Sequence, residues 1–255
     1  EVNVKTEDNA IAIDLGGTAS RLTEADAEIN LYLNKAMLAR QGWKLIEEQY
    51  PALFALVPKE VVRIGDVTVK GELKLSQVLS NATLQAYTDA GLLKAKVDVN
   101  AQGYYKASVD GINVNIAKIL PTSPLTYTNL KLKAEGNTKS GMFRGTASQT
   151  HLLGYEYQKI NLEGGYEEEL YNATIDVDDP NGRMMLRAQY DDTHLIPKYE
   201  LEVKVDSLDL HAMNLVDIHE GKSFSTHVTA SLKGHDIDQM TGKVIIDYLT
   251  KHQEG

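Results

Sequence analysis

"NATIDVDDPNG", residues 172–182, decides the fold class of this chain. Its first half alternates polar and apolar residues as a β-strand does, and its second half ends in a Pro-Asn-Gly turn. Residues 81–91, "NATLQAYTDAG", open with the same Asn-Ala-Thr and close on Gly after the same number of residues. A strand-and-turn phrase that occurs twice predicts a β-structure built from repeats.

Two-residue alternation extends outward from this phrase over most of the chain. "VKVDSLDL" (203–210) sets valines and leucines in register with charged residues between them, and "FSTHVTASLK" (224–233) does the same with hydroxyl residues. Such alternation is typical of strands with one apolar and one wet face. Turn signals recur at strand-and-turn intervals and no strand–helix alternation is present, so we expect antiparallel strands.

One segment has helical spacing instead. "NKAMLARQGWKLIEEQYPALFALVPKEV" (34–61) places apolar residues at helical intervals, and we expect a short helical segment near residues 34–57, divided at Gly42 and Pro51. It is interpreted as a plug over one end of the sheet. A partner-binding or membrane-touching element is the alternative, although Glu47, Glu48 and the lack of a basic face disfavour a membrane.

The repeats suggest a domain plan. Blocks of about 90–95 residues, each made of several strands, are expected to stack edge to edge because each leaves a strand edge for the next to cover. The plan comprises N-terminal strands with the helical plug (1–62), β repeat 1 (63–160) and β repeat 2 (161–255) in one continuous sheet.

Composition excludes several function classes. The chain has 255 residues, a net charge of −10 and no cysteine. The negative charge argues against nucleic acid and against electrostatic docking on anionic lipid. The absence of cysteine excludes disulfides and thiolate sites. The longest apolar run, residues 52–57, is too short to cross a membrane. Because the first residue is Glu, we expect the chain to be a piece of a longer protein.

Three motifs suggest chemistry and are interpreted as structure. "IAIDLGGTASR" (11–21) resembles the phosphate-binding turn of sugar kinases and actin-like ATPases, but "GTAS" recurs at 145–148 without the Asp, which favours a repeated strand. "DVDDPNG" (176–182) lacks the ligand pattern of a calcium loop and is expected to be a hairpin turn. Histidines at 211, 219, 227 and 235 are too spread out for a zinc site. We therefore expect no enzyme activity, no cofactor and no metal.

The second half of the chain resembles a known family. The pattern "Y-x-Y-x-x-I-x-L-x-G" is carried by Tyr155, Tyr157, Ile160, Leu162 and Gly164, and "D-D-P-N" follows at residues 178–181. These blocks resemble TamB-type members of the AsmA-like superfamily, particularly the form found in Bacteroidota. The resemblance covers residues 107–245 best.

The resemblance implies a fold and a role. The fold would be a long, twisted antiparallel sheet of stacked repeats, curled into an open hydrophobic groove. The full-length protein would lie in the periplasm, tethered to the inner membrane by an anchor outside this fragment. It would carry phospholipid acyl chains toward the outer membrane, with a BamA- or TamA-like β-barrel protein as a possible partner. A scaffold for outer-membrane protein translocation and assembly, without lipid carriage, is the alternative.

The alternating strands supply an inward face for such a groove. The candidate lining residues are Ile112, Val114, Leu130, Leu132, Ile160, Leu162, Ile175, Val177, Leu201, Val203, Val205, Phe224, Val228 and Leu232. Their polar neighbours, such as Lys131 and Lys204, would face water. The same alternation also describes a sandwich or solenoid with a sealed core, or a carbohydrate-binding sheet, so the residues alone leave those readings open.

Overall fold

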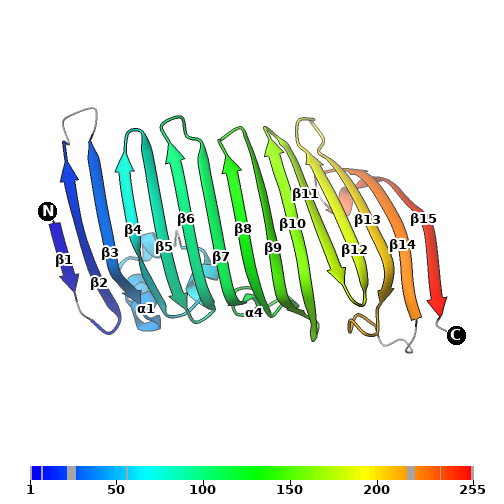
Figure 1. The fold of residues 1–255 in the computed structure, drawn as a ribbon, viewed down its shortest axis with the longest axis horizontal. Coiled ribbons are helices and arrows are strands. Elements are labelled where there is room, and N and C mark those ends of the chain that lie inside the picture. Colours follow the sequence, from blue (N-terminus) through cyan, green and yellow to red (C-terminus); the bar gives the residue numbers. More distant parts are fainter. Residues whose placement is uncertain are drawn as a thin grey trace. The chain divides into compact units, whose positions relative to one another are not determined.

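The computed structural model describes residues 2–6, 8–21, 27–55, 57–216, 222–235 and 237–253. Within these residues the chain forms one 15-stranded, open antiparallel sheet whose strands pair in sequence order (Figure 1). The predicted mostly-β fold with a few short helices is confirmed. Antiparallel neighbours can be joined by tight hairpins, which explains why turn signals recur along the whole sequence.

The chain divides into two compact units, residues 1–133 and 134–255, and the division falls inside a strand. Unit 1 contains β1 (Val2–Thr6), β2 (Ile11–Ser20), β3 (Glu28–Leu38), α1 (Arg40–Gln49), α2 (Pro51–Phe54), α3 (Lys59–Arg63), β4 (Val67–Ser76), β5 (Leu79–Thr88), β6 (Gly91–Asn100), β7 (Tyr105–Asn115), α4 (Ile116–Ile119) and most of β8 (Tyr127–Gly136). Unit 2 contains β9 (Ser140–Leu152), β10 (Tyr155–Glu167), β11 (Leu170–Asp179), β12 (Gly182–Asp191), β13 (Lys198–Asp209), β14 (Lys222–Lys233), the 3₁₀ turn η1 (Ile237–Gln239) and β15 (Thr241–Gln253).

The helical segment begins later than the sequence pattern predicts. Residues 34–38 complete β3, because the strand continues through a bulge instead of changing to helix. Helix α1 runs through Gly42 without a break, so the predicted division there is wrong. The predicted division at Pro51 is confirmed, since α2 starts at this residue, where a helix tolerates the missing N–H of proline.

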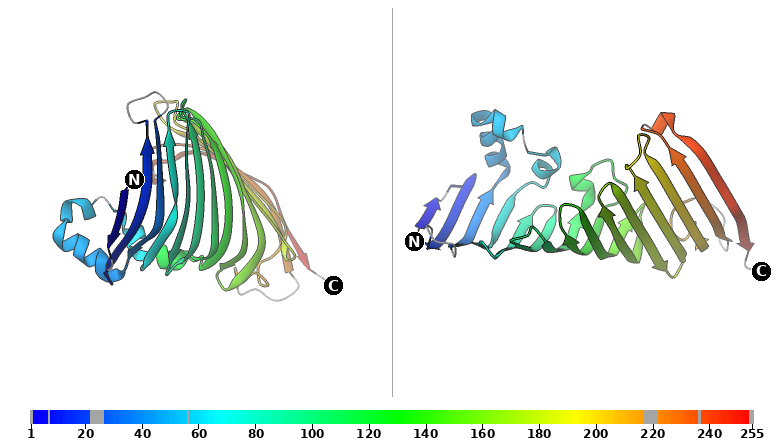
Figure 2. Two further views of the ribbon diagram at one scale, coloured as in Figure 1. Left: turned by 60° about the vertical axis from the view of Figure 1, so that its left-hand side comes forward. Right: turned by 90° about the horizontal axis from the view of Figure 1, so that it is seen from above.

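Gly42 is buried because α1 starts against the turn between β1 and β2. A Cβ at this position would lie 2.4 Å from the carbonyl oxygen of Ala10, to which the Ala39 N–H donates at 2.9 Å. Trp43 Nε1 donates to the carbonyl oxygen of Gly65 at 3.0 Å. The helices thus attach at the ends of the unit 1 strands (Figures 1 and 2). No helix in the described ranges is long and apolar enough to cross a membrane.

The phrase that occurs twice in the sequence has the same local structure in both places. Each copy contributes a strand and a tight turn, and each ends on a glycine that opens the next strand. Gly91 has a φ of 130° and Gly182 a φ of 132°. Side chains other than hydrogen rarely tolerate this backbone, which explains the shared glycine.

The neighbours of the strands that these glycines open are also built alike. Asn113 in β7 and Ser207 in β13 adopt left-handed backbone, with φ of 51° and 50°. The residues that follow them, Val114 and Leu208, are both 6% exposed and therefore buried. The two copies thus share a turn, a neighbouring strand with one left-handed residue and one buried apolar side chain after it.

Candidate functional site: the apolar face of the sheet

Cross-strand partners point to the same side of a sheet, so the register divides each unit into two faces. In unit 2 the register across β10–β14 arranges one face in four rows, which together form the unit 2 apolar face. The tyrosine row comprises Tyr166, Tyr171, Tyr190 and Tyr199. The small row comprises Gly164, Ala173, Ala188, Leu201 and Ala230. The aliphatic row comprises Leu162, Ile175, Leu186, Val203 and Val228. The closing row comprises Ile160, Val177, Met184 and Val205.

One end of the unit 2 apolar face is closed by side chains. Tyr157, Leu208 and Met213 form a buried cluster with two members of the closing row, and Met213 is 0% exposed. Met213 lies in the connection between β13 and β14, and Leu210 and Leu215 of the same connection pack against the cluster. At this end the apolar side chains are therefore removed from water.

The other end of the face carries the tyrosine row. The ring centroids of neighbouring tyrosines, in order from Tyr166 to Tyr199, lie 6.4, 5.8 and 5.0 Å apart. Burial among neighbours, followed by the hydrogen bond to Asp192, raises the pKa of Tyr190 to about 12. The Tyr166 hydroxyl donates to the carbonyl oxygen of Asn137. The rings pack on one another while these hydroxyl groups reach polar partners.

Between the two ends the apolar side chains are only partly covered. Every member of the aliphatic row is half-buried, and Leu201 in the small row is 37% exposed. All strands of unit 2 belong to a single sheet, and no second sheet among its described residues packs on this face. A contiguous exposed apolar surface of this kind indicates a site for an apolar ligand or partner.

The opposite face of unit 2 is charged. Glu202 accepts hydrogen bonds from Lys204 Nζ at 2.8 Å and from His227 Nε2 at 3.1 Å, and Arg187 Nη1 lies at 3.3 Å. The hydrogen bond from Lys204 is the largest cause that lowers the pKa of Glu202 to about 2. His227 also contacts Asp247 through Nδ1 at 2.6 Å. The sheet of unit 2 is therefore amphipathic.

Unit 1 has the same two-faced construction. One row across β2–β7 comprises Leu15, Leu33, Gly71, Leu84, Ala95 and Val109. The next row, on the other face, contains Lys70, Gln85 and Lys94. Leu84 is 38% exposed, and its Cδ2 would lie 2.7 Å from a Cβ at Gly71. The leucine side chain thus lies over bare glycine backbone and leaves part of its surface open.

Most of the predicted lining residues share these apolar faces. The unit 2 apolar face holds Ile160, Leu162, Ile175, Val177, Leu201, Val203, Val205 and Val228, and Leu232 extends it as the partner of Tyr199. Val177 and Val205 are buried at the closed end, where Phe224 packs against the cluster. Leu130 and Leu132 are half-buried in β8.

Ile112 and Val114 are predicted to share a face, and the structure separates them. The register partner of Ile112 is Leu92, on the face that carries Lys94, and Ile112 is 45% exposed. Val114 is buried instead, with its Cγ2 2.8 Å from the Cβ position of Gly111 on the apolar face. The left-handed residue between the two interrupts the alternation, and counting by twos along the sequence misses this change.

The tyrosine row is not among the predicted lining residues. A signal for it exists, because Tyr166 and Tyr171 flank the β10–β11 turn at equal distances, as Tyr190 and Tyr199 flank the β12–β13 turn. Equal spacing about an antiparallel turn makes two residues cross-strand partners. The small row carries no comparable sequence signal, since its members become neighbours only through the register.

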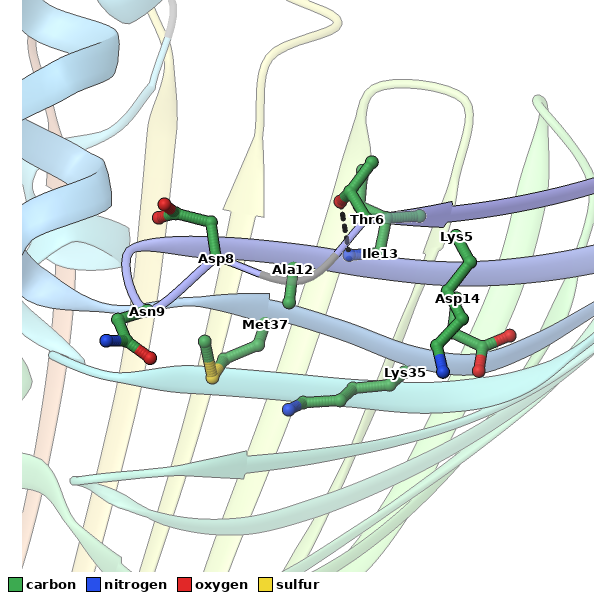
Figure 3. Close-up of a pocket in the computed structure, with 9 residues that line it drawn as sticks. All are labelled: Lys5, Thr6, Asp8, Asn9, Ala12, Ile13, Asp14, Lys35 and Met37. Atoms are coloured by element: carbon green, nitrogen blue, oxygen red, sulfur yellow. Dashed lines mark hydrogen bonds between the residues drawn. The ribbon is translucent and has the colours of Figure 1, made fainter.

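The stretch that resembles a phosphate-binding turn is extended strand. Residues 11–20 form β2 and the second "GTAS" lies within β9, so the prediction of a repeated strand is confirmed. A cavity of about 450 Å³ beside β2 is lined mainly by polar residues, among them Asp14 and Lys35, together with Ala12, Ile13 and Met37 (Figure 3). Asp14 accepts a hydrogen bond from Asn34, and the Thr6 hydroxyl accepts one from the Ile13 N–H. These polar groups thus serve local structure.

The predicted hairpin turn at residues 176–182 is confirmed, since it joins β11 to β12. The described residues contain no group of His, Asp or Glu side chains that could hold a metal ion. His219, one of the four spaced histidines, lies outside the described residues.

Comparison of the chain with family models, with curated proteins and with solved structures finds no match. The resemblance to TamB-type proteins therefore remains an inference from the motifs at residues 155–164 and 178–181.

Proposed function

We propose that this chain is a periplasmic segment of a bridge-like protein that carries phospholipid acyl chains along a hydrophobic β-groove toward the outer membrane. The observation that carries the proposal is the half-exposed apolar face in each unit, opposed by a charged face. A sheet that needed only to be soluble would present polar residues on any face left in water. The bound ligand would supply the missing cover.

The energetics suit a lipid. A two-chain phospholipid has on the order of 30 methylene groups, each worth about 0.8 kcal/mol when removed from water, so free passage through water costs more than about 20 kcal/mol. An apolar strip such as Leu162, Ile175, Leu186 and Val203 lowers that barrier without any reactive group. The charged side chains on the other face keep the protein in solution.

The cellular setting of the proposal comes from the resemblance. The resemblance implies a location in the periplasm, an inner-membrane anchor outside this fragment and a BamA- or TamA-like β-barrel partner in the outer membrane. The net charge of −10 is compatible with a location between two membranes, because a negatively charged chain is not attracted to anionic membrane surfaces.

A scaffold for outer-membrane protein assembly is the second candidate, and one feature favours it. Strand β15 has a single neighbour in the described sheet, and Val244, Ile246 and Leu249 are 59%, 61% and 68% exposed. An exposed apolar edge strand can pair with a strand of another chain. In this role a polypeptide would cover the strand.

Extraction of the purified protein with organic solvent, followed by mass spectrometry, tests the two candidates. We expect phospholipid to co-purify with the wild-type chain. Leu201→Glu places a charge on the apolar face at a position that is already 37% exposed, so the variant should fold and lose its lipid. Asn172→Glu is the matched control, because Asn172 is exposed on the opposite face between Gly165 and Gln189.

The outcomes separate the readings. Lipid in the wild type and in Asn172→Glu, but not in folded Leu201→Glu, supports carriage. A well-folded wild-type sample without lipid contradicts carriage and leaves the scaffold. Unfolding of Leu201→Glu would mean that the apolar face is sealed, since an unpaired buried charge is strongly destabilising.

A further inference from the structure

We infer that a bound acyl chain lies along the strands of unit 2, with its polar end at the tyrosine row and its methyl end at the buried cluster around Met213. This inference rests on the proposed lipid binding and goes beyond it, because it assigns a direction to the chain and a role to the tyrosines. The role is that of positioning residues at the boundary with water.

Polarity changes along each strand of the unit 2 apolar face. At one end the closing row packs on Tyr157, Leu208 and Met213, where side chains exclude water. At the other end hydroxyl groups meet polar atoms, with Tyr190 bonded to Asp192 and Tyr166 to Asn137. An amphiphile has the same gradient along its length, so one orientation matches both ends and the reverse orientation matches neither.

The length of the apolar strip also fits an acyl chain. Tyr171 and Val177 are both on β11, six residues apart, so the apolar strip between them spans about 20 Å at about 3.3 Å per residue. One leaflet of a bilayer holds its acyl chains in about 15 Å, half of the roughly 30 Å hydrocarbon core. The strip is therefore long enough for a complete acyl chain. It ends where the buried cluster blocks further extension.

The tyrosine row offers ring edges and hydroxyl groups to a ligand. Neighbouring rings are tilted by only 31–37° and their centroids lie 5.0–6.4 Å apart, so no gap wide enough for another ring is left between them. A sugar ring, which would need a free aromatic face, finds none between them. Ring edges and hydroxyl groups remain, and tyrosine favours sites with one apolar and one wet side.

A chain lying across the strands, in the small row, is the competing arrangement. The small row is not an open channel, because the ring of Phe143 lies 2.7 Å from the Cβ position of Gly164. Leu201 interrupts the same row three strands further on, after Ala173 and Ala188. Both features favour a chain that runs along the strands.

Photo-crosslinking of the wild-type protein tests the direction. The probes are phosphatidylcholine vesicles in which a diazirine sits either near the carbonyl or near the terminal methyl of the acyl chain. After irradiation, mass spectrometry of peptides locates the crosslinks. We expect the carbonyl-end probe to label the tyrosine row, including Tyr171 and Tyr190, and the methyl-end probe to label Met184 and Ile160, the half-buried members of the closing row.

A variant pair adds a second readout. Tyr190→Ala opens the tyrosine row, and we expect a several-fold lower yield of carbonyl-end crosslinks on β12 while methyl-end crosslinks persist. Tyr87→Ala is the control, since Tyr87 is 47% exposed and pairs with Leu92 on the other face of unit 1. Circular dichroism checks that both variants fold. If Tyr190→Ala does not fold, the positions of the crosslinks in the wild-type protein alone test the direction of the acyl chain.

The results distinguish this inference from the proposed function. Crosslinks that reverse the expected order, or that are the same for both probes, overturn the inference while lipid binding stands. No crosslinks from either probe, together with no lipid in the solvent extract, overturn both.

Discussion

The hydroxyl of Tyr155 donates a hydrogen bond to the carboxylate of Asp179, which is only 7% exposed at the end of β11. The same carboxylate accepts the N–H groups of Asn181 at 3.0 Å and Gln158 at 3.3 Å. The Asn181 side chain in turn donates to the Tyr155 hydroxyl at 2.9 Å. The two sequence motifs that carry the family resemblance therefore meet in space, where they tie β10 to the β11–β12 turn.

Tyr155→Phe should destabilise unit 2 by about 1–3 kcal/mol, because it removes one partner of a buried carboxylate and leaves the ring in place. Tyr171→Phe is the control: Tyr171 is 45% exposed, and its stacking survives the loss of the hydroxyl. Its effect should stay within about 0.5 kcal/mol. Urea unfolding followed by circular dichroism measures both. Equal effects would remove any special role for the Tyr155–Asp179 contact.

Leu84→Glu and Gln85→Glu test the apolar face of unit 1 with the same charge on adjacent residues. Gln85 faces Lys70 and Lys94, so a carboxylate there should be tolerated or slightly stabilising. Leu84 is 38% exposed on the apolar face, so its variant should fold but lose crosslinks between unit 1 and diazirine lipid. Circular dichroism measures whether each variant folds, and mass spectrometry locates its lipid crosslinks. Unchanged labelling of folded Leu84→Glu would contradict a lipid-binding role for this face.

The raised pKa of Tyr190 predicts how the stability of the folded protein changes at alkaline pH. Its pKa is raised from 10.0 to about 12, first by burial and then by the hydrogen bond to Asp192, so the folded state holds this proton more tightly than the unfolded state. The resulting stability is fully present below pH 10 and should be lost as the pH rises through about 12. Tyr190→Phe keeps the stacked ring and should lose less stability over that range. An absorbance titration of the phenolates in wild type and Tyr190→Phe measures the pKa of Tyr190. Ionisation of Tyr190 near its ordinary pKa would contradict the prediction.

Much of the fold could be predicted from the sequence because the information is local. Alternation such as Ile175–Asp176–Val177 fixes a strand and its two faces, and Pro180-Asn181-Gly182 fixes the turn that follows. The helical segment was predicted correctly in type, but its predicted start is too early. The apolar residues near Leu38 are compatible with a bulged strand as well as with a helix. Propensity alone does not separate these two outcomes.

The candidate site was less predictable because it depends on register. Ile112 keeps the alternation that starts at Val109 and therefore falls on the other face, whereas the left-handed residue Asn113 returns Val114 to the apolar face, and nothing in the residue type of Asn113 requires that backbone. The bulge at Ser207 has the same effect, since it returns Leu208 to the side of Val205. Long-range sorting into a tyrosine row and a small row appears only once the strands are paired.

The lowered pKa of Glu202 predicts how the stability of the folded protein changes in acid. The hydrogen bond from Lys204 leads the causes that lower its pKa from 4.5 to about 2. The charged form is therefore favoured by folding, and the stability it contributes is present above pH 4.5 and lost as the pH falls toward 2. Glu202→Gln should be less stable than the wild type at neutral pH, with a difference that shrinks as the pH falls through this range. Urea unfolding at several pH values measures it, and a constant difference would contradict the expectation.

Gly182→Ala tests the repeated turn against a second glycine that differs in one respect. Gly182 and Gly103 both have positive φ, 132° and 76°, but a Cβ at Gly182 would lie 2.5 Å from the Cα of Leu208, whereas nothing lies within 4 Å of one at Gly103. Gly103→Ala should therefore cost only the backbone strain, about 1–2 kcal/mol. Gly182→Ala should cost about 3 kcal/mol or more, because the bulged strand must also move. Chemical denaturation compares the two, and a Gly182→Ala variant no less stable than Gly103→Ala would show that the close approach to Leu208 does not matter.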